Sequence, residues 1–177
     1  RMGTLGPNLP LTLVSDSTLG TVPITNAVNA ALSDNVYATA ILALSAVSNY
    51  LKASNFQFAI PLNATVAGVT VSVERKSDTI SGTVDSSVRL VKAGVISGND
   101  KASGSTWPTS DGTVSYGSAT DLWGLTLTPA DINASTFGVA INASATLAST
   151  MSIDAITITI DYTGINRING YWMQGFS

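Results

Sequence analysis

Residues 69–76 read Val-Thr-Val-Ser-Val-Glu-Arg-Lys, so that apolar and polar side chains alternate along the chain. In an extended strand this order turns the three valines to one face and the polar residues between them to the other. Residues 153–162 repeat the period, with isoleucines at 156, 158 and 160 between Thr157, Thr159 and Asp161. A period of two residues is typical of strands with one face against a core and one in water. The two stretches predict a protein built from antiparallel sheet.

Shorter candidate strands lie along the rest of the chain, separated by turns rich in Gly, Pro, Asn and Asp. They occur at residues 11–14, 36–43, 50–58, 88–92, 95–96, 113–116 and 137–143. Thr128 followed by Pro129 predicts one short helix, because a hydroxyl caps a helix start and proline suits its first turn. Residues 33–163 contain seven of these strands, or eight if 88–92 and 95–96 are separate, and their spacing of about 10–15 residues predicts an all-β fold. We expect an antiparallel β-sandwich of jelly-roll or immunoglobulin-like kind.

The chain of 177 residues has the length of one domain. Residues 1–32 are punctuated by proline and glycine and carry few charges, which predicts an extended N-terminal arm. Residues 33–163 hold the clear strand patterns and form the predicted sandwich. Residues 164–177 follow as a C-terminal tail.

The composition excludes several classes of function. The chain has no His and no Cys, which removes imidazole chemistry, thiol nucleophiles, Cys/His zinc sites and disulfides. Its net charge of −3 argues against nucleic acid as a partner, which would need a basic face. We find no apolar run long enough to cross a membrane. The sequence therefore predicts a protein that is not an enzyme, needs no cofactor and binds neither nucleic acid nor a membrane.

Several stretches carry a resemblance to a known group of proteins. They are residues 33–39, 48–56, 66–76, 85–92, 121–124 and 128–133. These stretches resemble β-sandwich modules of structural proteins from tailed bacteriophages and some bacterial surface proteins. The resemblance covers residues 33–163 and implies a non-enzymatic virion component, such as a capsid decoration or cement protein or a head, neck, tail or fibre component. The expected partners are copies of the chain and other virion structural proteins.

The two ends are the first candidate for a functional surface, since apolar side chains in such arms would otherwise meet water. We expect Leu11, Leu13 and Val14 to add a strand to the sheet of another subunit. Tyr171, Trp172 and Phe176 are expected to anchor in an adjoining pocket, giving a homo-oligomer such as a trimer or a repeating array. The alternative is that both ends fold back and cover the edges of their own sandwich.

A second candidate is an aromatic platform made by Trp107, Tyr116 and Trp123, on which a sugar ring would stack. The alternative is that these rings close the rim of the sandwich core. Exposure separates the two readings, since solvent-facing rings favour glycan binding and buried rings favour a structural role. The corresponding alternative function is a carbohydrate-binding module for attachment to a host or cell surface.

Acidic and amide residues in the turns raise the question of a calcium site. They are Asp34, Asn35, Asp78, Asp85, Asn99, Asp100, Asp111 and Asp121. Their spacing does not match an EF-hand loop, and such residues populate turns for backbone reasons. We therefore predict no metal site. The sequence leaves a further alternative open, a subunit of an extracellular filament or surface layer, so that the expected location is the virion or, alternatively, the cell exterior.

Overall fold

The two stretches with a period of two residues form neighbouring antiparallel strands at the centre of one sheet. In the computed structural model, which describes residues 1–164, these strands are β5 (Thr65–Ser77) and β10 (Ser149–Thr163). Val69, Val71 and Val73 face inward and are completely buried, as are the isoleucines at 156, 158 and 160. Burying each such side chain contributes about 1.5–3 kcal/mol, so this pair carries much of the core.

Each of two sheets contains five strands. The first sheet has the order β1, β10, β5, β8, with β3 also pairing with β10; the second has the order β2, β4, β9, β6, β7. The remaining strands of the first sheet are β1 (Met2–Asn8), β3 (Ala38–Leu42) and β8 (Gly112–Ser118). The second sheet contains β2 (Thr12–Asp16), β4 (Tyr50–Ser54), β6 (Thr83–Lys92), β7 (Val95–Ser97) and β9 (Gly138–Ala145). Every pairing between these strands is antiparallel.

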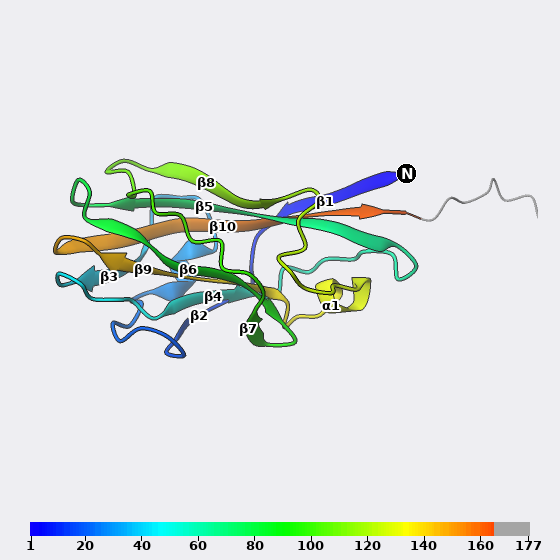
Figure 1. Ribbon diagram of the computed structural model, residues 1–177, viewed down its shortest axis with the longest axis horizontal. Coiled ribbons are helices and arrows are strands. Elements are labelled where there is room, and N and C mark those ends of the chain that lie inside the picture. The colour runs from blue at the N-terminus through cyan, green and yellow to red at the C-terminus, as the bar shows by residue number, and fades with distance from the viewer. Residues whose placement is uncertain (165–177) are drawn as a thin grey trace, which may run out of the picture.

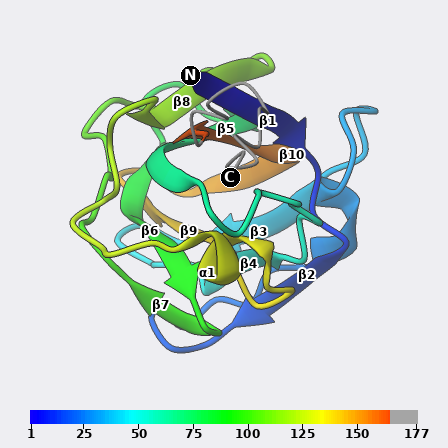
Figure 2. The ribbon, with the colours of Figure 1, turned by 90° about the vertical axis from the view of Figure 1, so that its right-hand side faces the viewer.

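The sheets pack face to face as a β-sandwich, which confirms the predicted fold class (Figure 1). Seen along the strands, the sheet of β8, β5, β10 and β1 lies above that of β6, β9, β4 and β2 (Figure 2). The inner faces of both sheets contribute to one continuous hydrophobic core, with Leu51, Leu90 and Ile141 from the second sheet completely buried. The predicted alternation is present in β5 and in the second half of β10, whereas β9 is buried along almost its whole length.

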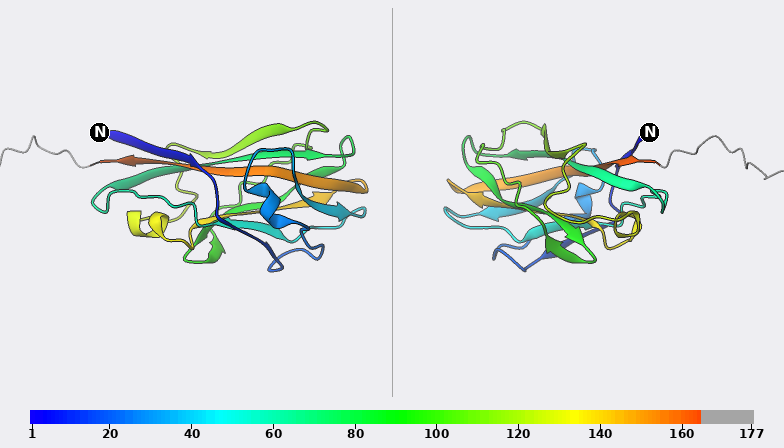
Figure 3. Two further views of the ribbon diagram at one scale, coloured as in Figure 1. Left: turned by 180° about the vertical axis from the view of Figure 1, so that it is seen from behind. Right: turned by 45° about the vertical axis from the view of Figure 1, so that its right-hand side comes forward.

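Two short helices complete the described residues. The α-helix α1 (Pro129–Asn133) lies at one end of the sandwich, and the 3-10 helix η1 (Ala27–Ala30) lies beside its strands (Figure 3). Thr128 caps α1 as predicted: its side chain accepts from the Asp131 N–H, and the Asp131 carboxylate accepts from the Thr128 N–H. Within residues 1–164, neither helix has the length and apolar character needed to cross a membrane.

The N-terminal segment is part of the sandwich, which corrects the expectation of an arm over residues 1–32. β1 forms an edge of the first sheet by pairing with β10, and β2 forms an edge of the second by pairing with β4. Each strand forms backbone hydrogen bonds with a strand of its own chain that would otherwise be an open sheet edge. These hydrogen bonds stabilise β1 and β2 as strands, although proline and glycine lower the strand propensity of their sequences.

Candidate functional site

The three aromatic residues expected to form a sugar platform are buried. Trp107 is 1% exposed, Trp123 is 0% exposed and Tyr116 is 4% exposed. Each indole N–H has an acceptor in the interior: Trp107 Nε1 donates to Asp85 Oδ1 at 2.9 Å and Trp123 Nε1 to the Val69 carbonyl at 2.9 Å. Because their polar groups are satisfied inside, these rings can lie in the core. The three rings are therefore not placed to stack on a sugar at the surface, and their burial agrees with the alternative in which they close the core.

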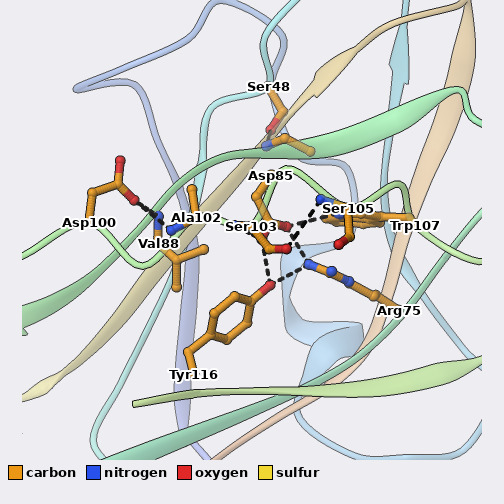
Figure 4. Close-up of polar contacts among 11 residues, drawn as sticks. Ser48, Arg75, Asp85, Val88, Asp100, Ala102, Ser103, Ser105, Trp107 and Tyr116 are labelled. Atoms are coloured by element: carbon orange, nitrogen blue, oxygen red, sulfur yellow. Dashed lines mark hydrogen bonds and ion pairs between the residues drawn. The ribbon is translucent and has the colours of Figure 1, made fainter. Parts of the chain in front are cut away.

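Two of these aromatic residues, Trp107 and Tyr116, surround the carboxylate of Asp85, which is buried in β6 rather than lying in a turn as the sequence predicts. Asp85, in β6, accepts hydrogen bonds from four groups (Figure 4). Its Oδ1 accepts from Arg75 and Trp107, and its Oδ2 accepts from the Tyr116 hydroxyl at 2.8 Å and the Ser103 N–H at 2.9 Å. We call Arg75, Asp85, Trp107 and Tyr116 the Asp85 cluster. The Asp85 carboxylate therefore links these four donor groups, all of which belong to the protein.

The Asp85 cluster connects the two sheets. Arg75 lies in β5 and Tyr116 in β8 of the first sheet, whereas Asp85 lies in β6 of the second. The Arg75 guanidinium also lies 4.6 Å from the centre of the Trp107 ring, a favourable cation–π distance. Burial, followed by the negative charge of Asp85, raises the pKa of the Tyr116 hydroxyl well above its ordinary value. Tyr116 therefore stays protonated and serves as a donor, and the enclosed cluster has a structural role.

A second group of carboxylates lies near the end of β5. Carboxylate oxygens of Glu74, Asp111 and Asp154 lie within 4.8 Å of one another. Protein groups already contact all three: Asp154 accepts from the Asp34 and Asn35 N–H groups, Glu74 from the Ser33 hydroxyl, and Asp111 from the Tyr37 hydroxyl at 2.7 Å. Lys76 adds a positive charge 3.6 Å from Asp111. These contacts account for the grouping without a bound cation.

The residues expected to dock on another subunit divide between core and surface. Leu13 is buried within its own sandwich, while Leu11 is 63% exposed and Val14 is 42% exposed. The strand that contains Leu13 and Val14 pairs with β4 of the same chain and forms an edge of its own second sheet. Its addition to another subunit's sheet stays a prediction. Tyr171, Trp172 and Phe176 lie outside the described residues.

Among residues 1–164, strands of the sandwich line two surface grooves. The first, of about 350 Å³, lies over the outer face of the first sheet beside the end of β1. It is lined by Pro7, Leu9, Leu32, Ser33, Ser72, Glu74, Thr113, Ala155 and Thr157. The second, of about 380 Å³, is lined by Thr12, Val14, Lys52, Ser54, Asn55, Val91, Gly94, Ser135 and Thr136. Both are built from strands far apart in sequence, and neither contains an aromatic side chain.

No protein-family model matches the chain, and no curated protein matches its sequence. Several solved structures are similar in shape at low identity. A CBM4 carbohydrate-binding module is 14% identical with a TM-score of 0.43, over 78% of this chain and 89% of that one. The BiXyn10A CBM1 in its apo form is 7% identical with a TM-score of 0.35, over 92% and 97% of the two chains. A family two carbohydrate esterase from Cellvibrio japonicus is 11% identical with a TM-score of 0.31, over 93% of this chain and 34% of the esterase. At these TM-scores the likenesses carry no argument about function.

Proposed function

We propose that the chain is a non-enzymatic structural module that assembles with copies of itself and with other proteins. The setting implied by the resemblance is the virion of a tailed bacteriophage, and an extracellular filament or surface layer would use the same properties. The observation that carries the proposal is the surface, which combines few charges with many exposed aliphatic side chains. Only 11% of the residues are charged, against about 25% in typical soluble domains.

The exposed aliphatic side chains come from many parts of the fold. Ile41 is 79% exposed, Ile80 78% and Leu62 77%. Others at least 45% exposed are Met2, Leu11, Leu19, Val28, Leu32, Val36, Leu44, Val95 and Leu147. Single exposed apolar residues are ordinary on protein surfaces. Many exposed aliphatic side chains on a surface with few charges favour a surface that another protein covers on assembly. The burial of the aromatic rings supports the same choice over glycan binding.

We predict that the full chain forms assemblies larger than its monomer mass of 18.1 kDa at high concentration. Replacing Tyr171, Trp172 and Phe176 together with Ser is expected to reduce that assembly, because aromatic anchors supply much of the energy of protein interfaces. Light scattering over a range of concentrations measures both effects. The variant is preferable to deletion of residues 1–32, since that deletion would also remove β1 and β2 from the sandwich.

A chain that stays monomeric at every concentration would contradict self-assembly. The prediction for the three aromatic residues would be wrong if the variant assembled as readily as the original chain. The matched control is Asn63→Ser, which changes an exposed polar side chain in a turn and leaves the exposed aliphatic side chains in place.

The second groove favours one alternative function, binding of a glycan. Its lining includes hydroxyl, amide and ammonium groups from Thr12, Lys52, Asn55 and Thr136, which can hydrogen-bond to sugar hydroxyls. A glycan screen followed by titration of Thr12→Val and Thr136→Val would test this alternative. Loss of affinity in both variants would support it over the assembly proposal.

A further inference from the structure

Three loops meet at one end of the sandwich. They are residues 43–46 after β3, residues 79–82 between β5 and β6, and residues 146–148 between β9 and β10. Hydrogen bonds join them: the Ser45 N–H donates to the Ala145 carbonyl at 2.9 Å, and the Thr146 N–H donates to the Gly82 carbonyl at 2.9 Å. We call these three loops the loop end. It lies at the far end of the strands from the N-terminus (Figure 1).

The loop end exposes aliphatic side chains. Ile80 is 78% exposed, Leu44 64% and Leu147 49%, and each belongs to a different one of the three loops. None of the residues in these loops is charged. A lone exposed aliphatic residue is ordinary, whereas three from separate loops at one end of a domain favour a surface that a partner covers.

A negative charge lies at the border of this surface. Asp78 directly precedes the second loop, and its carboxylate accepts hydrogen bonds from the Thr150 N–H at 2.7 Å and from the Thr79 hydroxyl at 3.0 Å. The hydrogen bond from the Thr150 backbone is the main reason why the pKa of the Asp78 carboxyl lies below its ordinary value. A partner that matches the loop end would therefore combine large apolar side chains with a positive charge.

The C-terminal residues have this composition. Residues 165–177 read Ile-Asn-Arg-Ile-Asn-Gly-Tyr-Trp-Met-Gln-Gly-Phe-Ser, and Arg167 is the one charged side chain among them. Tyrosine, tryptophan and arginine are the side chains that most often supply the binding energy of protein interfaces. We call residues 165–177 the aromatic segment.

The length of β10 determines which molecule supplies the aromatic segment. β10 runs from Ser149, beside the loop end, to Thr163, opposite Met2, which is a distance of about 46 Å at about 3.3 Å per residue. From Gly164 to Trp172 a fully extended chain spans at most about 29 Å. Trp172 therefore cannot reach the loop end of its own chain, but it can reach that of another copy.

We propose that the loop end of one molecule binds the aromatic segment of a second copy of this chain. The inference rests on the proposed assembly function and identifies the surface that receives the segment. Arg167 of the second copy pairs with Asp78, and the aromatic side chains of that copy cover the aliphatic residues of the loop end. Because two different surfaces meet, copies add head to tail and form an open filament or a closed ring.

The test uses two variants of the full chain. The loop-end variant carries Ile80→Ser and Leu147→Ser, and the segment variant carries Tyr171→Ser, Trp172→Ser and Phe176→Ser. We expect the association constant of each variant alone to be lower than that of the original chain by at least about tenfold, because each has lost one side of the contact. Sedimentation velocity measures association, and circular dichroism with thermal unfolding shows whether each variant folds.

A mixture of the two variants gives the sharpest result. The loop-end variant keeps its aromatic segment and the segment variant keeps its loop end, so one contact between them is intact. We expect an equimolar mixture to form a pair with about twice the monomer mass of 18.1 kDa and to grow no further. A mixture that stays monomeric while the original chain assembles would overturn the head-to-tail contact.

The matched control is Val28→Ser with Val95→Ser. Val28 is 67% exposed and Val95 is 63% exposed, so the control removes comparable aliphatic surface outside the three loops. The proposal predicts that this control associates like the original chain. An equal loss in the control and in the loop-end variant would overturn the loop end as the binding site. If the loop-end variant does not fold, Leu44→Ser with Ile80→Ser repeats the test at the same surface.

The remaining outcomes separate this inference from the proposed function. Assembly that is lost in the segment variant and unchanged in a folded loop-end variant overturns this site and leaves assembly through another surface. Loss in the loop-end variant alone also overturns it, because the loop ends of two copies would then pair with each other. A full chain that is monomeric at all concentrations overturns both the inference and the proposed function.

Discussion

Replacement of Asp85 with Ala is expected to lower the free energy of unfolding by about 3–5 kcal/mol, because it leaves the Arg75 guanidinium charged and buried without its partner. The side chain of Arg75 is 4% exposed and that of Asp85 is 0% exposed, so water cannot replace the lost contact. The substitution also removes the acceptor of the Trp107 and Tyr116 donors and of the Ser103 N–H. Each donor left unsatisfied in the interior adds to the loss.

Urea unfolding followed by circular dichroism measures this change. Lys101→Met is the matched control, because it breaks an ion pair with Asp121 in which both side chains are 28% exposed. Ion pairs of this kind contribute about 0–1 kcal/mol, so the control should differ little from the original chain. A similar small loss for both variants would show that the Asp85 cluster does not hold the two sheets together.

The Asp85 cluster also shows what the sequence pattern contains and what it does not. Arg75 continues the spacing of Val69, Val71 and Val73, so the period of two residues already places it on the inner face. Its partner cannot be read from the same pattern. Asp85 lies in another sheet and Trp107 in a loop, and only the packing of the two sheets brings them together. The burial of Arg75 could be predicted from its place in the alternation of residues. Its contacts with Asp85 and Trp107 could not, because they depend on tertiary structure.

The edge strands mark the limit of local sequence signals. The predicted strand at residues 11–14 is present as β2, and the predicted strands at residues 88–92 and 95–96 are present within β6 and β7, which pair with each other. β1 was missed because glycine and proline weaken its local propensity, and its pairing with β10 spans nearly the whole chain. Such pairing depends on an open edge formed by other strands, which no short window of sequence contains.

The aromatic residues illustrate the same limit for the candidate site. Trp107 and Trp123 lie in irregular segments rich in turn residues, and the sequence alone offers both a sugar platform and rings that close the core rim. Each side chain instead reaches an acceptor from a distant strand, Asp85 for Trp107 and the Val69 carbonyl for Trp123. Only the three-dimensional structure shows the exposure of these two side chains, which distinguishes a sugar platform from rings that close the core.

Trp123→Ala is expected to cost about 3–5 kcal/mol of unfolding free energy, the range found when a buried aromatic side chain is removed from a core. The indole is completely buried and its N–H donates to the Val69 carbonyl. Gly117 leaves room for this contact, since a Cβ on Gly117 would lie 2.5 Å from Trp123 Nε1. The smaller change Trp123→Phe keeps much of the ring volume but leaves the carbonyl without this donor, so a loss of about 1–3 kcal/mol is expected.

Guanidinium unfolding measures the two losses, with Leu62→Ala as a control, because Leu62 is 77% exposed and its truncation should change stability by less than about 0.5 kcal/mol. The Trp123→Phe variant also separates the two readings of the aromatic residues. A sugar platform requires a ring at the surface, so Trp123→Phe would weaken glycan binding and leave stability nearly unchanged. A ring enclosed against Val69 predicts the reverse: stability falls, and the affinity for any glycan bound in the second groove stays the same. If Trp123→Phe lost glycan affinity and kept its full stability, that result would contradict the burial of Trp123. It would support a carbohydrate-binding function instead.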